Sequence, residues 1–220
     1  MSNIKLDIDK VYLTHWSKLI DRKEFLNTHL SLNNIDNIEW VELYDKENWN
    51  KEDIIKEYPN IFGLNPPRFN YTNGRYLNES EISLALKHCW IIKDAFNKNY
   101  ESILILEDDV VLVENFTEKF NSYKNQLPEN WDSCFIGTCC DLHAQLVNGR
   151  NVYKTNGSRC THAYILSRKE ISKLINEVNT INDCIDWYYN LVIHKLQLEN
   201  YWFEPSIANQ NTIYKSTIQQ

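Results

Sequence analysis

Residues 102–113 read SILILEDDVVLV, and this stretch is the strongest strand signal in the chain. The unbroken apolar run at 103–106 is typical of a central strand that is buried on both faces by helices. The run ends abruptly in Glu107-Asp108-Asp109. Burying an isolated carboxylate costs much free energy, so such acids are usually paired with cations or metal. The stretch therefore predicts either a solvated turn or a charged site at the mouth of a buried strand.

The segments on either side of this stretch alternate between strand and helix patterns. Strands are expected at 11–16, 38–44, 133–137 and 163–166, and helices from Ile20, from Asn78 or Ser80, and over 116–127, 167–176 and 183–196. This alternation predicts one α/β sandwich with a mainly parallel sheet over residues 1–220. Residues 45–78 are polar and broken by Pro and Gly, so we expect an irregular loop there, with acceptor contacts or closure over a donor.

The composition of the chain argues against nucleic-acid-binding and membrane-spanning proteins. The chain has 220 residues, 43% hydrophobic and 24% charged, which suits one ordinary globular core. Its formal net charge of −7 argues against nucleic acid as the main partner, because phosphate backbones require a basic surface. It contains no apolar run of about 18 residues, so no membrane span is expected. The start lacks the apolar core of a signal peptide, and six cysteines form no CxxC pair, which predicts reduced thiols in a cytoplasmic protein.

The acidic triplet suits a divalent cation. In an extended chain Glu107 and Asp109 point to one side and Asp108 to the other. A hard ion such as Mn²⁺ or Mg²⁺ could take oxygen ligands from that side together with both phosphates of a nucleotide diphosphate. Ligands of open α/β sheets also bind beyond the carboxyl ends of the strands, where these acids fall. A bare acidic triplet is nevertheless a weak signal, and a solvated turn explains it equally well.

Residues 77–88, LNESEISLALKH, and 103–110, ILILEDDV, together resemble glycosyltransferase family 25. That family includes bacterial lipooligosaccharide galactosyltransferases and the collagen galactosyltransferases. Five of its features recur here in order: Asp21-Arg22 after an opening strand, the Glu81-Ile82 to His88 helix, Glu107-Asp108-Asp109, Thr161-His162-Ala163-Tyr164, and Asp186 followed by Pro205 and Gln210. The chain departs from the family at His15-Trp16, usually Asn-Leu, at Cys160, commonly Gly, and at Lys87, usually Ser.

The resemblance implies a GT-A fold, with Asp109 as a direct metal ligand. Glu107 or Asp108 would then touch the ribose, the sugar or a metal-bound water, and Glu107 is the second candidate ligand. The other residues expected around a uridine diphosphate (UDP) sugar donor are Thr14, His15, Asp21, Arg22, Glu81, His88 and Gln210. Four of them have a structural alternative: Asp21 and Arg22 as a surface pair or helix cap, and His15 and His88 as packed histidines.

The resemblance further implies transfer of galactose or glucose to a hydroxyl of a glycan or of a hydroxylysine-type side chain. Some members invert the anomeric centre by direct displacement, which requires a general base. Asp186 is the candidate base and Asp183 the reserve, three residues apart on an expected helix and so on one face, although Asp183 also suits that helix's cap. The competing hypotheses are a catalytically silent binding module and a metal-dependent hydrolase. The hydrolase would need further ligands, such as paired histidines, near the acids.

Overall fold

A seven-stranded sheet forms the centre of the computed structural model, which describes residues 4–65, 74–137 and 150–213. The strand order is β2-β1-β3-β7-β5-β8-β6, and β4 pairs separately with β9. The strands are β1 (Lys10–Thr14), β2 (Ile38–Val41), β3 (Ser102–Glu107), β4 (Val110–Leu112), β5 (Ser133–Phe135), β6 (Val152–Lys154), β7 (Ala163–Ser167), β8 (Asn200–Phe203) and β9 (Ala208–Gln210). The helices are α1 (Ile20–Leu32), α2 (Lys51–Glu57), α3 (Glu79–Asn97), α4 (Phe116–Lys124), α5 (Arg168–Leu174) and α6 (Ile185–Leu196), with a 3₁₀ turn at Val178–Thr180.

Five of the seven central strands point in one direction. β1 pairs in parallel with β2 and β3, and β5 with β8, whereas β7 and β6 run against their neighbours. The α/β sandwich with a mainly parallel sheet is thus confirmed, and the sheet is mixed.

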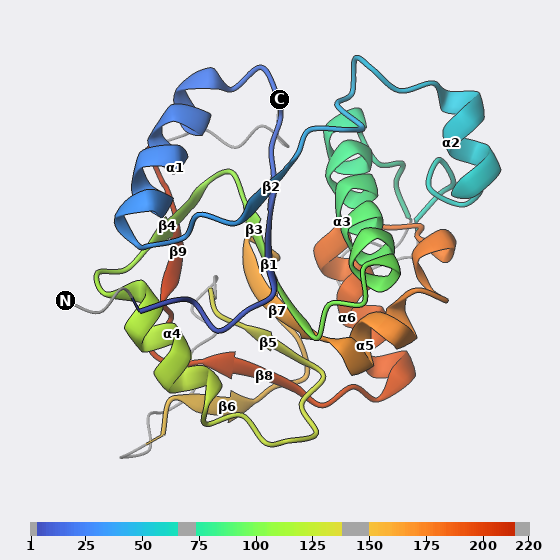
Figure 1. The fold of residues 1–220 in the computed structure, drawn as a ribbon. Helices are drawn as coiled ribbons and strands as arrows, with labels where there is room; N and C mark the ends of the chain where they lie inside the picture. The colour runs from blue at the N-terminus through green and yellow to red at the C-terminus, as the bar shows by residue number, and fades with distance from the viewer. Residues whose placement is uncertain (1–3, 66–73, 138–149, 214–220) are drawn as a thin grey trace.

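Helices lie on both sides of the sheet (Figure 1), and an apolar core fills the space on each side. Ile103 and Ile105 of β3 pack into one core with α3, α5 and α6, and Leu104 and Leu106 pack into the other with α1 and α4. Because successive side chains of a strand face opposite sides, a strand covered on both sides must be apolar at every position. This explains the unbroken run before Glu107.

Helix α3 begins where the sequence indicates. The side chain of Asn78 accepts a hydrogen bond from the backbone N–H of Glu81, and the Glu81 carboxylate accepts one from the Asn78 N–H, which makes a capping box. This reciprocal cap fixes the start of α3. The helix packs beside β1 and places Lys87 and His88 near the edge of the sheet.

Two predictions about loops and helix starts are wrong. The 45–78 segment contains helix α2, whose cap Asn50 accepts from the N–H groups of Glu52 and Asp53 and whose Ile54 is buried. A short helix needs only a cap and one buried anchor, and this signal is weaker than the Pro and Gly around it. Helix α6 begins at Ile185 rather than at Asp183, so Asp183 and Asp186 do not share a helix face. Part of the predicted loop, 66–73, lies outside the described residues.

The cysteine prediction is wrong at one position. Cys89, Cys134 and Cys184 are free, but Cys160 is disulfide-bonded. Disulfide formation depends on the approach of two side chains in space, which the absence of a CxxC pair does not exclude. Among the described residues, no helix has both the length and the apolar character needed to cross a bilayer.

Candidate active site

Two chain segments meet at the carboxyl edge of the sheet. β1 and β3 are parallel neighbours, and their register sets Thr14 opposite Glu107. The residues that follow each strand, His15 and Trp16 on one side and Asp108 and Asp109 on the other, therefore lie next to each other. The position of the acids at this edge is the one that ligands of α/β sheets use.

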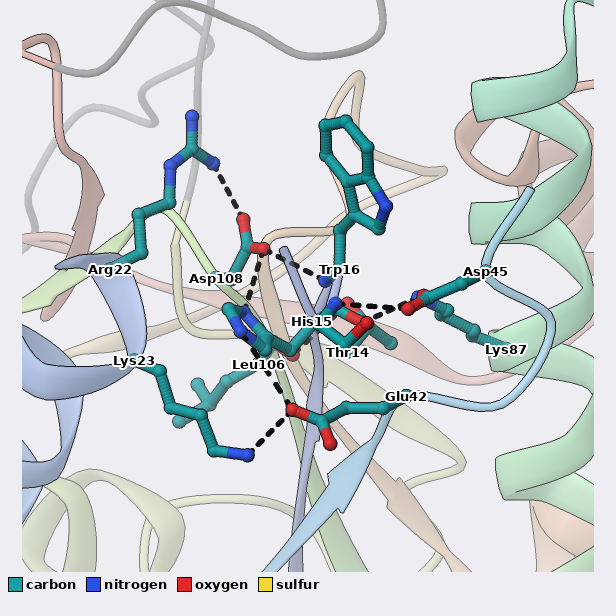
Figure 2. Close-up of polar contacts among 11 residues, drawn as sticks. Thr14, His15, Trp16, Arg22, Lys23, Glu42, Asp45, Lys87, Leu106 and Asp108 are labelled. Carbon is teal, nitrogen blue, oxygen red and sulfur yellow. Dashed lines mark hydrogen bonds and ion pairs between the residues drawn. The ribbon is translucent and has the colours of Figure 1, made fainter. Parts of the chain in front are cut away.

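Asp108 is held by donors of the protein itself, as Figure 2 shows. Its Oδ1 lies 2.6 Å from Nη1 of Arg22, and its Oδ2 lies 3.1 Å from Nδ1 of His15 and 3.3 Å from the Trp16 backbone nitrogen. Burial alone would raise the pKa of Asp108, but the His15 hydrogen bond and the Arg22 charge outweigh it and hold the pKa below the ordinary value. Both oxygens are thus occupied, and Asp108 joins β1, α1 and β3.

A buried ion pair between Lys87 and Asp45 stabilises the same edge of the sheet. The ammonium of Lys87, 3% exposed, lies 2.5 Å from both the His15 carbonyl oxygen and Oδ1 of Asp45, which is 1% exposed (Figure 2). Oδ2 of Asp45 accepts from the Ser17 N–H at 3.0 Å. The pair joins α3 to the segments after β1 and β2. Sequence reasoning missed Asp45, and the available signal was a lysine between the apolar Leu86 and the buried His88.

Asp109 has the opposite environment. Its Oδ1 is buried and has no hydrogen-bond partner within the described part of the chain, and its Oδ2 accepts from Nε2 of Gln210 at 3.3 Å. Burial, followed by the negative charges of Glu107 and Asp108, raises the pKa of Asp109 to about 7. An orphaned carboxylate oxygen in a negative setting fits a bound cation. Over the described ranges, no group of three or more His, Cys, Asp or Glu could hold a metal, so a cation here would need oxygens from a ligand or from water.

Glu107 is backed by a buried histidine. Its Oε1 accepts from Oγ1 of Thr161 at 2.8 Å and lies 3.6 Å from Nε2 of His88. Nδ1 of His88 lies 2.8 Å from the hydroxyl of Tyr164, and the two rings stack. His88 is 0% exposed, so it lies behind Glu107 and supports it rather than lining an open surface.

Two hollows open beside the acids, and Glu107 and Leu84 line both. The β1 hollow is lined by Thr14, His15, Trp16, Arg22, Lys46, Ser80, Ser83, Leu84, Glu107, Asp108 and Asp109. The α6 hollow is lined by Arg75, Glu81, Leu84, Glu107, Arg159, Cys160, Thr161, Cys184, Ile185, Asp186, Trp187 and Gln210. A ligand that extends past Glu107 can therefore occupy both.

The other predicted site residues fall into two groups. Glu81, which forms two hydrogen bonds with the Arg75 guanidinium, lines the α6 hollow together with Asp186 and Gln210. Asp21 is exposed on α1, and neither hollow includes it. Asp183 is buried, accepts from Nδ2 of Asn65 at 2.9 Å and from the Cys184 N–H at 2.8 Å, and lines neither hollow.

The comparison with protein families gives a match over more than half of the chain. Residues 8–139 match the model of glycosyltransferase family 25, described as an LPS biosynthesis protein. A relative from Acanthamoeba polyphaga mimivirus, a procollagen lysyl hydroxylase and glycosyltransferase, is 27% identical over 141 residues, which is 53% of this chain. That alignment covers 15% of the viral protein, so the chain spans only a small part of its relative.

Solved structures share the fold at low sequence identity. A glycosyltransferase involved in the glycosylation of the major capsid of PBCV-1 superposes with a TM-score of 0.50 and 14% identity, covering 94% of this chain and 93% of that one. The A197 protein of STIV gives a TM-score of 0.47 and 14% identity over 88% of this chain and 80% of its own. At 14% identity the likeness to the PBCV-1 glycosyltransferase concerns the fold alone, and nothing is concluded from the lower score of A197.

Proposed function

The chain belongs to glycosyltransferase family 25 and is a glycosyltransferase of GT-A fold, and from this we propose that it transfers a hexose, galactose or glucose, from a UDP-sugar. The acceptor is a hydroxyl of a glycan or of a hydroxylysine-type side chain, and the reaction inverts the anomeric centre with the help of Mn²⁺ or Mg²⁺. Residues 1–220 act as one domain. The observation that carries the proposal is the buried, unpartnered Oδ1 of Asp109 in the β1 hollow, two residues after Glu107, which lines both hollows.

We assign the β1 hollow to the uridine and ribose of the donor. Thr14, His15 and Trp16 line it, and the ammonium of Lys46 lies 4.7 Å from the centre of the Trp16 ring. A nucleobase is flat and partly apolar, so an indole with polar groups around it suits its recognition. Arg22 lines the same hollow while it pairs with Asp108. Asp21, which lies outside the hollow, would assist only indirectly.

The diphosphate lies beside Asp109 and Glu107. Asp109, with Glu107 as the second candidate ligand, would hold Mn²⁺ or Mg²⁺, which when bound neutralises the diphosphate and the departing nucleotide. Gln210 donates to Asp109 at 3.3 Å and also lines the α6 hollow, from which its amide can reach a phosphate oxygen. His88 supports Glu107 from behind.

Transfer takes place in the α6 hollow, with Asp186 as the base. The acceptor oxygen forms a bond to the anomeric carbon, the bond from that carbon to the diphosphate oxygen breaks, and the acceptor proton passes to the Asp186 carboxylate. Asp186 lines this hollow whereas Asp183 is buried against Asn65, which favours Asp186 over the reserve candidate.

The test is release of UDP from a panel of UDP-sugars, with and without Mn²⁺. The proposal predicts metal-dependent release that favours one hexose and is lost in Asp109→Ala. Asp53→Asn, which changes an acid on the exposed face of α2, is the matched control and keeps full activity. Neither release nor metal-dependent donor binding by the wild-type protein would leave a catalytically silent, transferase-like binding module as the better account.

We also propose a cytoplasmic location. The free thiols of Cys89, Cys134 and Cys184 support it, and the disulfide-bonded Cys160 is the observation that stands against it. Alkylation in intact cells followed by fractionation tests it. Recovery of the protein in a secreted or periplasmic fraction would contradict the proposal.

A further inference from the structure

A third hollow continues outward from the α6 hollow. It is lined by Lys154, Thr155, Asn156, Gly157, Ser158, Arg159, Trp187, Asn190, His194 and Trp202. Arg159 and Trp187 line both hollows, so the two are contiguous. We call this region the outer hollow. Trp187 directly follows Asp186, and both line the α6 hollow, so the outer hollow adjoins the hollow that holds the proposed base.

Helix α6 and the 155–160 segment, which line the outer hollow, are held together by hydrogen bonds. Trp187, Asn190 and His194 lie at i, i+3 and i+7 on α6 and so share one face of the helix. The Asn190 side chain accepts from the Ser158 N–H at 3.0 Å and donates to the Ser158 carbonyl oxygen at 2.5 Å. This pair of hydrogen bonds fastens the 155–160 segment to the helix.

Gly157 is required for this close approach. Its φ of +149° is rare for residues with a side chain, and an added Cβ would lie 2.0 Å from Oδ1 of Asn190. The segment therefore stands preformed against α6, as a binding wall should, because a ligand does not have to order it on binding.

The chemistry of the lining suits a sugar chain. Two half-buried indoles, Trp187 and Trp202, supply flat apolar surface for the C–H faces of pyranose rings. The remaining lining residues offer hydroxyls, amides and cations, and they include no carboxylate.

We propose that the outer hollow is the subsite for an acceptor oligosaccharide. Resting on the proposed transferase function, this assigns the acceptor to the glycan class: the reacting sugar lies beside Asp186, the next ring lies on Trp187, and further rings extend towards Trp202 and His194. A hydroxylysine side chain would reach Asp186 without using this surface.

The proposal can be tested on an array of immobilised mono-, di- and tetrasaccharides and hydroxylysine-containing peptides. The readout is binding of the protein in the absence of the sugar donor. Disaccharides and tetrasaccharides are expected to bind and monosaccharides are not. Trp187→Ala weakens oligosaccharide binding about tenfold or more, the loss expected when a ring contact is removed. Trp131→Ala, which removes a partly buried indole of the opposite core, behaves as wild type.

His194→Ala provides a second variant at an exposed position that tolerates change. Its loss of binding is expected to be smaller and confined to tetrasaccharides. Preferential binding of the peptides, equal binding of mono- and tetrasaccharides, no glycan binding at all, or undiminished binding by folded Trp187→Ala would each overturn the proposal.

Donor cleavage separates this inference from the proposed function. A protein that binds oligosaccharides through Trp187 but cleaves no donor would refute the transferase proposal and uphold the subsite. Metal-dependent donor cleavage without glycan binding would do the reverse.

Discussion

Asp108 and Asp109 are adjacent in the chain and have opposite environments. On the β1 side, Asp108 is bound by Arg22, His15 and a backbone N–H, and its pKa is lowered. On the β9 side, Asp109 has a buried oxygen without a partner, and its pKa is raised to about 7. Neighbouring acids whose pKa values are pushed apart commonly have different roles in a functional site.

These environments assign Asp108 to the folded framework and Asp109 to ligand binding. Asp108 has its cation within the fold, and it fixes the edges of β1 and β3. Asp109 lacks one, and the cost of leaving it charged is relieved only by a proton or by a cation brought in with the substrate. The following predictions test this division, beginning with the largest expected effect.

Removing the guanidinium of Arg22, which pairs with Asp108, should destabilise the fold. Arg22→Met leaves Asp108 largely buried without its guanidinium partner, and we expect a loss of about 3–5 kcal/mol in the free energy of unfolding. Urea denaturation followed by circular dichroism measures this. The double variant Arg22→Met/Asp108→Asn removes both charges and should recover most of the loss. A single variant as stable as wild type would show that the pair contributes little to the framework.

Removing the carboxylate of Asp109 should leave the stability of the fold intact and abolish metal-dependent UDP release. Asp109→Asn relieves the repulsion from Glu107, so the unfolding free energy without metal should be unchanged or higher. Metal-dependent UDP release should fall more than about 100-fold, because loss of even an outer-shell partner of a metal commonly costs 10–100-fold. Kinetics with Mn²⁺ and a metal-free thermal melt give the two readouts. Loss of stability in parallel with activity would place Asp109 in the framework.

The pH dependence of stability should reveal the raised pKa of Asp109. Because its folded pKa, about 7, lies above the ordinary 3.8, the folded protein holds this proton more tightly. The stabilisation is complete below pH 3.8 and is lost as pH rises through 7. Metal-free wild type should therefore lose about 2–3 kcal/mol more than Asp109→Asn between pH 5 and pH 8. Glu170, whose pKa burial raises to about 8, contributes equally to both proteins and cancels.

Denaturant melts at the two pH values, without metal, measure that difference. Parallel pH profiles for wild type and Asp109→Asn would contradict the division between the two acids. Added Mn²⁺ with UDP should flatten the wild-type profile above pH 7, because a bound cation replaces the proton.

A smaller effect is expected from the support of Glu107. Tyr164→Phe removes the hydroxyl that contacts Nδ1 of His88, and we expect a fall of about 1 kcal/mol in stability. The kcat for UDP release should fall while the donor KM changes little, since the residue acts through His88. Tyr189→Phe is the matched control: it removes a buried hydroxyl that donates to Glu170 and should lower stability without changing kcat. Equal kcat losses in both would indicate a general packing effect.

How much of the structure could be predicted from the sequence depends on how far apart in the chain the interacting residues lie. The buried strand before Glu107 and the start of α3 are local patterns: the sequence predicts the strand, and it offers Asn78 or Ser80 as the cap, of which the structure has Asn78. The contacts of Asp45 with Lys87 and of Glu107 with His88 join positions 42 and 19 residues apart, and only the folded sheet edge brings them together. Likewise, the burial of Asp183 against Asn65, 118 residues away, leaves no trace in a helical pattern.

The most direct test of the division between Asp108 and Asp109 is a Mn²⁺ titration with UDP present, monitored by electron paramagnetic resonance of the free ion. It compares wild type, Asp109→Asn and Asp108→Asn at a temperature where all three are folded. We predict that Asp109→Asn abolishes Mn²⁺ binding and that Asp108→Asn retains it. Mn²⁺ binding that survives in Asp109→Asn but disappears in Asp108→Asn would contradict this account.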